Sequence, residues 1–357
     1  MTTKEENGGH REEWFRRKER SRAIGQKVVP GVPPDLANSI DDNGSLVTVP
    51  PADWIICFVP GLQAQWWHRF VLSKHKHVFA MRPTSSGSWI LVEPWWTRLM
   101  VTVLPPADAV RYLRWGAMGN ILRVRENVPG RASQLRGWFN CAVLTAFILG
   151  RRTWTWTPHG LFRRLLKEDG TRSEEVQNLL VEQFSRVVKQ HSSSALAIGA
   201  DQASMSFEEL LTIIARNMIE AMLTPSILEI YYTAVLEADR YPDATRVYAR
   251  EGPDRAVAVL TRMFNKATKD REIELSDCGT AAHRFLAMLH GDIRLQALLQ
   301  IGKLPTPSEM DLRARATVRT FLNGVRADSS RSERKAVLEA QRSDEAHPGG
   351  AREQVPR

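Results

Sequence analysis

Between positions 54 and 127, apolar residues come in short runs divided by turn residues. The runs WIICFVP and HVFAMRP are rich in β-branched and aromatic residues, which favour strands. HVFAMRP, TSSGS and WILVEP together place two such runs around a Gly/Ser turn and predict a β-hairpin. RLMVTVLP and NILRVREN predict two more strands, and ADAVRYLRW between them predicts a short helix that Asp108 caps.

Beyond position 173 the apolar residues recur with the period of a helix, as in SEEVQNLLVEQFSRVVKQ. Ser206 and Glu209, three residues apart, predict a capping box at the start of another helix. The pair Gly252-Pro253 interrupts a later stretch, because proline cannot continue a helix that precedes it. A last helix is predicted to begin at Ser308, with Asp311 three residues on.

Composition divides the chain at the same place. Residues 46–172 hold 17 basic and 6 acidic residues, whereas residues 173–326 hold 18 and 20, so the net charge of +9 comes from the first segment. All 11 tryptophans lie between Trp14 and Trp156. The polar stretch KEDGTRS (167–173) between the two segments is typical of a linker.

We therefore expect an α+β domain of short antiparallel strands and helices over 46–168, and an all-α domain over 173–326. Residues 1–45 and 327–357 are polar and are predicted to be disordered. No apolar run approaches the roughly 20 residues that cross a bilayer. Three widely spaced cysteines favour a reducing compartment, the cytoplasm, and predict neither a disulfide framework nor a metal or cofactor site.

The stretch GWFNCAVLTAFILG (137–150) raises a question of chemistry, because Cys141 stands where a loop turns into an apolar helix. A thiol at a helix N-terminus beside a histidine can act as a nucleophile, with a third polar group orienting the imidazole. His77 opens one predicted strand and Glu93 ends the next. A second helix follows the cysteine helix, with Thr157 as N-cap and Pro158 at its first position.

This order, with NCAVLTAFILG followed by TPHGLFRRLL, resembles papain-like cysteine hydrolases of the NlpC type in a circularly permuted, phage-associated form. The resemblance covers most of the first domain and its motifs are short. It implies Cys141 as nucleophile, His77 as base and Glu93 as orienting group.

Each of these residues also has a structural explanation. Cys141 fits a core helix, since free cysteine is among the most buried residue types. His77 is chosen over His68 and His75 by its strand position alone, and Glu93 also fits a simple strand end. The three-residue site is therefore a hypothesis.

The basic, tryptophan-rich composition of residues 46–168 leaves nucleic-acid binding open. Arginines alternate with aromatic residues in RRTWTWTPHGLFRR, which is compatible with phosphate contacts and base stacking. No nucleic-acid motif occurs in the segment, however, and its positive charge also fits a solvated surface.

In the second half, TPSILEIYYTAVLEADRYPDATRVYAREGPDRAVAVL and LSDCGTAAHRFLAMLHGDIRLQALL resemble the C-terminal regulatory domain of TetR-family repressors, of the AefR-like proteobacterial subtype. The resemblance implies an all-helical domain that senses a ligand and forms a homodimer through its last two helices. The candidate residues lining a pocket for a small apolar ligand are Met222, Tyr231, Tyr232, Phe264 and Met288. The same residues also fit an ordinary core, because their helical spacing is typical of one.

The chain departs from that family before position 173, where strands are predicted in place of the three-helix DNA reader with its helix-turn-helix. The favoured function is therefore a TetR-type dimerisation and ligand-sensing domain in a regulator-like protein, fused to a papain-like domain. The alternative is a cysteine hydrolase, a peptidase or amidase, that uses Cys141, His77 and Glu93.

Overall fold

The computed structural model describes residues 49–62, 72–95, 98–127, 140–151, 155–197 and 205–325. The chain divides into two compact units. The first contains the sheet and extends to Glu175, and the second begins with Val176. The second unit also includes residues 83–89 and 104–110. The predicted disordered segments 1–45 and 327–357 lie outside the described residues.

The first unit is built on a six-stranded sheet with the strand order β4-β3-β2-β1-β5-β6. Its strands are β1 (Asp53–Val59), β2 (His77–Pro83), β3 (Trp89–Pro94), β4 (Leu99–Leu104), β5 (Asn120–Arg125) and β6 (Arg172–Ser173). β1 pairs in antiparallel fashion with β2 and with β5, so that Cys57 faces Phe79 on one side and Ile121 on the other. The predicted strands are all present.

The hairpin of β2 and β3 turns through the predicted Gly/Ser stretch. Thr84 accounts for the closure, since its backbone N–H and its hydroxyl both donate to the Ser88 carbonyl oxygen at 2.9 Å. Gly87 adopts a φ of 96° inside this turn, a conformation that favours glycine. The turn chemistry read from the sequence therefore sets the pairing of the two strands that carry His77 and Glu93.

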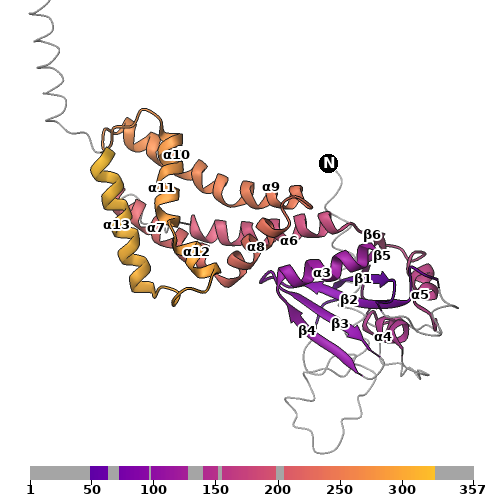
Figure 1. The fold of residues 1–357 in the computed structure, drawn as a ribbon. Helices are drawn as coiled ribbons and strands as arrows, with labels where there is room; N and C mark the ends of the chain where they lie inside the picture. Colours follow the sequence, from indigo (N-terminus) through magenta and orange to yellow (C-terminus); the bar gives the residue numbers. More distant parts are fainter. Residues whose placement is uncertain are drawn as a thin grey trace, which may run out of the picture. The chain divides into compact units, whose positions relative to one another are not determined.

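Helices cover both faces of the sheet (Figure 1). The helices α4 (Cys141–Ile148) and α5 (Pro158–Leu165) pack on a buried cluster that includes Ile56 and Phe58 of β1. On the other face α3 (Pro106–Ala117) approaches the sheet closely, because a Cβ on Gly116 would lie 2.9 Å from the Cys57 sulfur. Alternation along β1 thus sends its side chains to two separate layers.

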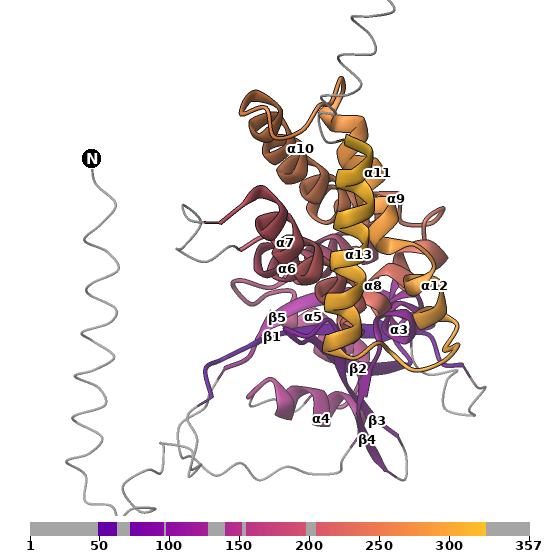
Figure 2. The ribbon, with the colours of Figure 1, turned by 90° about the vertical axis from the view of Figure 1, so that its left-hand side faces the viewer.

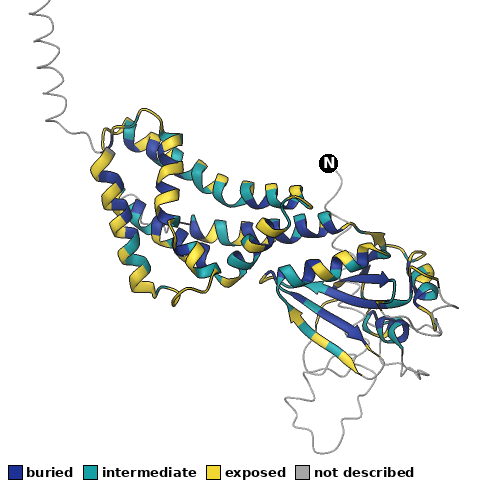
Figure 3. Cartoon of the chain, viewed as in Figure 1, coloured by how far each residue is buried: buried dark blue, intermediate teal, exposed yellow. Residues whose placement is uncertain are grey.

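The strand β4 forms the outer edge of the sheet and differs from the buried strands beside it. Leu99, Val101 and Val103 are exposed on one of its faces. Figure 3 shows exposed positions, in yellow, along this strand. At the opposite edge, β6 pairs with β5 through Leu122 and Ser173. The stretch predicted to be a linker therefore ends in a short strand of the first unit.

The second unit is helical. Its helices are α6 (Val176–Ala195), α7 (Phe207–Leu223), α8 (Pro225–Leu236), α9 (Pro242–Glu251), α10 (Pro253–Lys269), α11 (Cys278–His290), α12 (Ile293–Leu298) and α13 (Pro307–Val325). Helix α13 packs against α7 and α11, an arrangement that can be followed in Figure 2. These observations confirm the predicted fold class, an α+β domain followed by an all-helical one.

Local signals explain most helix boundaries. Ser206 and Glu209 form the predicted capping box. Gly252 separates α9 from α10, as its position before proline predicts. Two starts were wrong: α3 begins at Pro106, with Asp108 inside its first turn, and α13 begins at Pro307. Thr306, just before the helix, and Glu309 make the reciprocal cap of α13, with the Thr306 backbone N–H donating to the Glu309 carboxylate at 2.7 Å.

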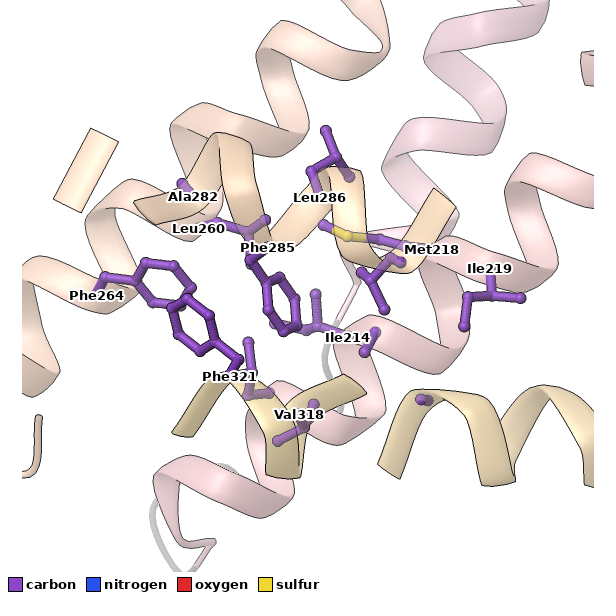
Figure 4. Close-up of a cluster of buried hydrophobic side chains, with 14 of the residues drawn as sticks. Ile214, Met218, Ile219, Leu260, Phe264, Ala282, Phe285, Leu286, Val318 and Phe321 are labelled. Atoms are coloured by element: carbon purple, nitrogen blue, oxygen red, sulfur yellow. The ribbon is translucent and has the colours of Figure 1, made fainter. Parts of the chain in front are cut away.

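The core of the second unit is a cluster of buried side chains from α7, α10, α11 and α13, with three phenylalanines at its centre (Figure 4). The rings of Phe264 and Phe321 stack at 5.1 Å, and the edge of Phe285 meets each of them at 6.0 Å and 5.1 Å. Burial of such side chains is the main favourable term in folding. Among the helices that the structure describes, none is both long and apolar enough to span a membrane.

Candidate functional site

The structure brings His77 and Glu93 together on neighbouring strands. His77 is the first residue of β2 and Glu93 lies near the end of β3. The Nε2 atom of His77 lies 3.3 Å from Oε1 of Glu93, and the glutamate side chain is only 2% exposed against 21% for the histidine. The pair is therefore a buried carboxylate that orients a partly accessible imidazole.

Cys141 is the first residue of α4, and the start of that helix is held from two sides. The Asn140 side chain is the N-cap and accepts a hydrogen bond from the Val143 backbone N–H at 2.9 Å. Its amide nitrogen donates to the Trp156 carbonyl oxygen at 2.9 Å. Cys141 is partly buried and lies close enough to His77 to act on the pKa of its imidazole. The structure thus places Cys141, His77 and Glu93 near one another, with a direct contact between His77 and Glu93.

These contacts change the protonation of the imidazole. Burial lowers the pKa of His77, but its hydrogen bonds to Cys141 and Glu93 and the charges of those groups outweigh burial and raise the pKa to about 9. His77 is therefore protonated at neutral pH.

Two residues that sequence reasoning missed complete this arrangement, Tyr112 and Trp115 of α3. The Tyr112 hydroxyl donates to Oε2 of Glu93 at 3.2 Å. The Trp115 ring stacks on the His77 ring at 5.9 Å, while its indole N–H donates to the Pro60 carbonyl oxygen at 3.0 Å. Their spacing of three residues places them on one helix face, but nothing in the sequence relates that face to His77.

The competing histidines lie elsewhere. His75 is 2% exposed; its Nδ1 lies 3.0 Å from Nδ1 of His159 and its Nε2 lies 2.7 Å from the Asn120 side-chain oxygen. Burial lowers the pKa of His75, so this histidine is neutral at neutral pH. His68 lies outside the described residues. Of the two candidate histidines described, His77 is therefore the one whose pKa Cys141 affects, as its position at the start of a strand suggested.

The other two cysteines have different surroundings. Cys57 is fully buried, and burial raises the pKa of its thiol, which makes it unreactive. Cys278 opens α11, with its sulfur 3.7 Å from the Thr268 hydroxyl. In the described part of the chain, no group of three or more His, Cys, Asp or Glu side chains is placed to hold a metal ion.

Some of the arginines of the first unit form ion pairs with glutamates of the same unit. Arg123 contacts Glu174 at 2.7 Å, and Arg151 contacts Glu168 at 2.7 Å. Arg163 and Arg164, in the basic stretch with alternating aromatic residues, lie on the last turn of α5 and are exposed. The basic character of the segment is thus divided between internal ion pairs and surface arginines.

The predicted ligand-lining residues do not form one group. Met222 and Phe264 are buried members of the core cluster, whereas Tyr232 and Met288 are 48% and 37% exposed. Tyr231 is partly buried under the guanidinium of Arg294, which lies 4.6 Å from its ring centre.

Several solved structures of TetR-family regulators resemble this chain in part. A protein described as a TetR-family transcriptional regulator from Mesorhizobium loti is 19% identical, covers 53% of this chain and 87% of its own, and gives a TM-score of 0.37. The Flavonoid-responsive Regulator FrrA is 17% identical, with coverages of 52% and 85% and a TM-score of 0.40. A TetR transcriptional regulator from Agrobacterium tumefaciens is 17% identical, with coverages of 49% and 86% and a TM-score of 0.33.

No curated protein matches the chain. A family model does match its second half, over α7 to α13. Residues 209–324 match the C-terminal domain of the AefR-like transcriptional repressors, which confirms the TetR-type resemblance of this segment.

Proposed function

We propose that this chain is a regulator-like protein whose helical unit forms a homodimer and binds a small molecule, as TetR-type C-terminal domains do. The observation that carries the proposal is the match of residues 209–324 to the AefR-like repressor C-terminal domain. It is supported by exposed apolar side chains in α12, in the loop after it and in α13. These are Leu295, Leu299, Ile301, Leu304 and Leu312, each more than half exposed. Apolar residues gathered in this way are typical of an interaction surface.

The dimer is tested by sedimentation of the full chain at micromolar concentration. We expect a dimer for the wild type and a monomer after the double substitution Leu295→Asp and Leu299→Asp. Leu236→Asp is the matched control, because Leu236 is 57% exposed but lies on α8. A monomeric wild type, or a dimer that survives the double substitution, argues against the proposed surface.

A second function, cysteine-dependent hydrolysis in the first unit, is favoured by one observation: the contacts of His77 with both Cys141 and Glu93. Glu93 occupies Nε2, which leaves Nδ1 of His77 for the thiol. In the proposed reaction the thiolate attacks the carbonyl carbon of an amide or ester. His77 gives its proton to the leaving group, and water then cleaves the acyl-enzyme with the imidazole as base.

This function is tested by alkylation with iodoacetamide at neutral pH, followed by mass spectrometry of the modified cysteine. We expect Cys141 to react first, and His77→Ala to slow its labelling roughly 10-fold or more. Labelling of Cys278 in the same samples is the internal control and should not change. If His77→Ala leaves the rate at Cys141 unaltered, the catalytic proposal fails while the dimer proposal stands.

A further inference from the structure

Four polar side chains from four helices meet in the second unit. Arg294 of α12 lies with its guanidinium 4.6 Å from the ring centre of Tyr231 on α8. The Tyr231 ring lies 5.8 Å from that of Tyr248 on α9, and Arg294 is close enough to Tyr248 to act on the pKa of its hydroxyl. The charge of Arg294 also acts on His290, the last residue of α11. None of these four residues belongs to the core cluster of Figure 4.

The arginine in this cluster is incompletely paired. Its Nε atom is buried and has no hydrogen-bond partner. Asp292, two residues before Arg294, contacts Arg313 at 3.7 Å. Glu229 on α8 has a pKa raised by burial, with no contribution from Arg294. A buried donor without an acceptor destabilises the fold, because it loses its hydrogen bonds to water and gains none in return. Contact with the Tyr231 ring offsets only part of that cost.

The backbone holds the cluster in place. Gly291 separates α11 from α12 with a φ of 44°, and a Cβ there would overlap the Arg313 guanidinium. The turn therefore requires glycine, and it sets the relative positions of His290 and Arg294 on its two sides. An incompletely satisfied arginine at such a fixed position needs an explanation beyond packing.

We propose that Arg294 binds the carboxylate of a small organic acid, with Tyr248 and His290 as neighbouring hydrogen-bond donors. This inference rests on the ligand-sensing part of the proposed function and names the chemical class of the ligand. A carboxylate pairs with the fork of a guanidinium through Nε and one Nη together, so it satisfies the atom that has no partner. The carbon skeleton of the acid lies against the tyrosine rings.

The protonation of the neighbours fits an anion. Burial raises the pKa of Tyr248, so its hydroxyl stays protonated and can donate. Burial and the charge of Arg294 lower the pKa of His290 to about 4, so this imidazole is neutral at pH 7 and keeps one N–H. Because Nε is covered in this structure, the acid enters when the side chains over the cluster move.

The test is calorimetric titration of the full chain with benzoate and hexanoate, each compared with its neutral amide, benzamide or hexanamide. We expect at least one carboxylate to bind roughly 10-fold or more tightly than its amide, and Arg294→Gln to remove that difference. Arg315→Gln is the matched control, because Arg315 is 63% exposed on α13 and pairs with Asp311. It should bind as the wild type does.

A second readout separates ligand binding from a structural role. If Arg294 serves only to hold helices together, Arg294→Gln lowers the melting temperature of the unliganded protein. If the guanidinium instead lacks a partner until a ligand binds, the melting temperature stays within about 2 °C or rises. Equal binding of carboxylates and amides, or carboxylate binding unaffected by Arg294→Gln, overturns the inference and leaves ligand sensing intact. Failure of all four compounds to bind overturns the inference, and ligand sensing itself is then decided by a wider screen of neutral apolar compounds.

Discussion

The Nε2 atom of His77 donates to the carboxylate of Glu93 across 3.3 Å, from one strand of the sheet to the next. The Tyr112 hydroxyl donates to the second oxygen of the same carboxylate at 3.2 Å. Both oxygens of Glu93 are therefore engaged, which fixes the imidazole plane that faces Cys141.

Replacing Glu93 by Gln should slow alkylation of Cys141 and any thiol-dependent hydrolysis by roughly 10²-fold, because the imidazole loses both its orientation and a negative neighbour. The pH dependence of the alkylation rate tests whether the effect runs through His77. The transition that His77 causes should move to lower pH, because Glu93 no longer raises the pKa of the imidazole. Tyr112→Phe keeps the carboxylate and should give a smaller change of the same sign. An unmoved profile in Glu93→Gln would show that the glutamate does not act on His77.

Stability should fall as pH rises through about 9, because the folded pKa of His77 lies near 9 and the unfolded value near 6.5. A raised histidine pKa stabilises the fold fully below the unfolded value, and that contribution is lost above the folded one. The loss should be about 3 kcal/mol at most. Urea unfolding between pH 6 and pH 10 measures it, and His77→Gln should flatten this part of the curve. An equal fall in both proteins would assign it to other groups.

Phe264→Ala should destabilise the helical unit by about 3–5 kcal/mol, since the side chain is fully buried between Phe285 and Phe321. Leu312→Ala removes a side chain that is 69% exposed and should change the free energy of unfolding by less than about 0.5 kcal/mol in the monomer. Chemical denaturation followed by far-UV circular dichroism compares the two. Similar losses for both variants would contradict the assigned core.

Gly119→Ala should be strongly destabilising, by more than about 2 kcal/mol, because a Cβ there would overlap the Phe58 carbonyl oxygen and lie 2.7 Å from that of Lys74. Gly324→Ala is the contrasting variant: nothing lies within 4 Å of its Cβ, and alanine in α13 should add up to about 1 kcal/mol. Melting temperatures of the two proteins should therefore move in opposite directions.

Local patterns were sufficient to predict most elements. The TSSGS turn predicts the β2–β3 hairpin, and Ser206 with Glu209 predicts the start of α7, because both rest on contacts between residues a few positions apart. The start of α13 shows the limit of such rules. Ser308 with Asp311 and Thr306 with Glu309 both fit a capping box, and Pro307 at the first helical position decides between them.

Contacts between distant residues could not be predicted in the same way. The two-residue strand β6 forms only because it pairs with the edge of β5. The residues KEDGTRS themselves carry no strand pattern that would predict it. The sequence singled out Cys141, His77 and Glu93 by their positions at element ends, but Tyr112 and Trp115 acquire their roles only through the packing of α3. Arg294 likewise carries no sequence signal, since its missing partner is a property of the folded cluster.

The edge strand β4 has a practical consequence. Its outer side presents backbone hydrogen-bonding groups that no other described strand pairs with, and Leu99, Val101 and Val103 are exposed beside them. A strand of another molecule can pair with such an edge. Concentrated preparations of the isolated sheet should accordingly tend to precipitate or form fibres. The substitution Val101→Lys places a charge on this edge and is the simplest way to reduce such pairing in samples for crystallisation or NMR.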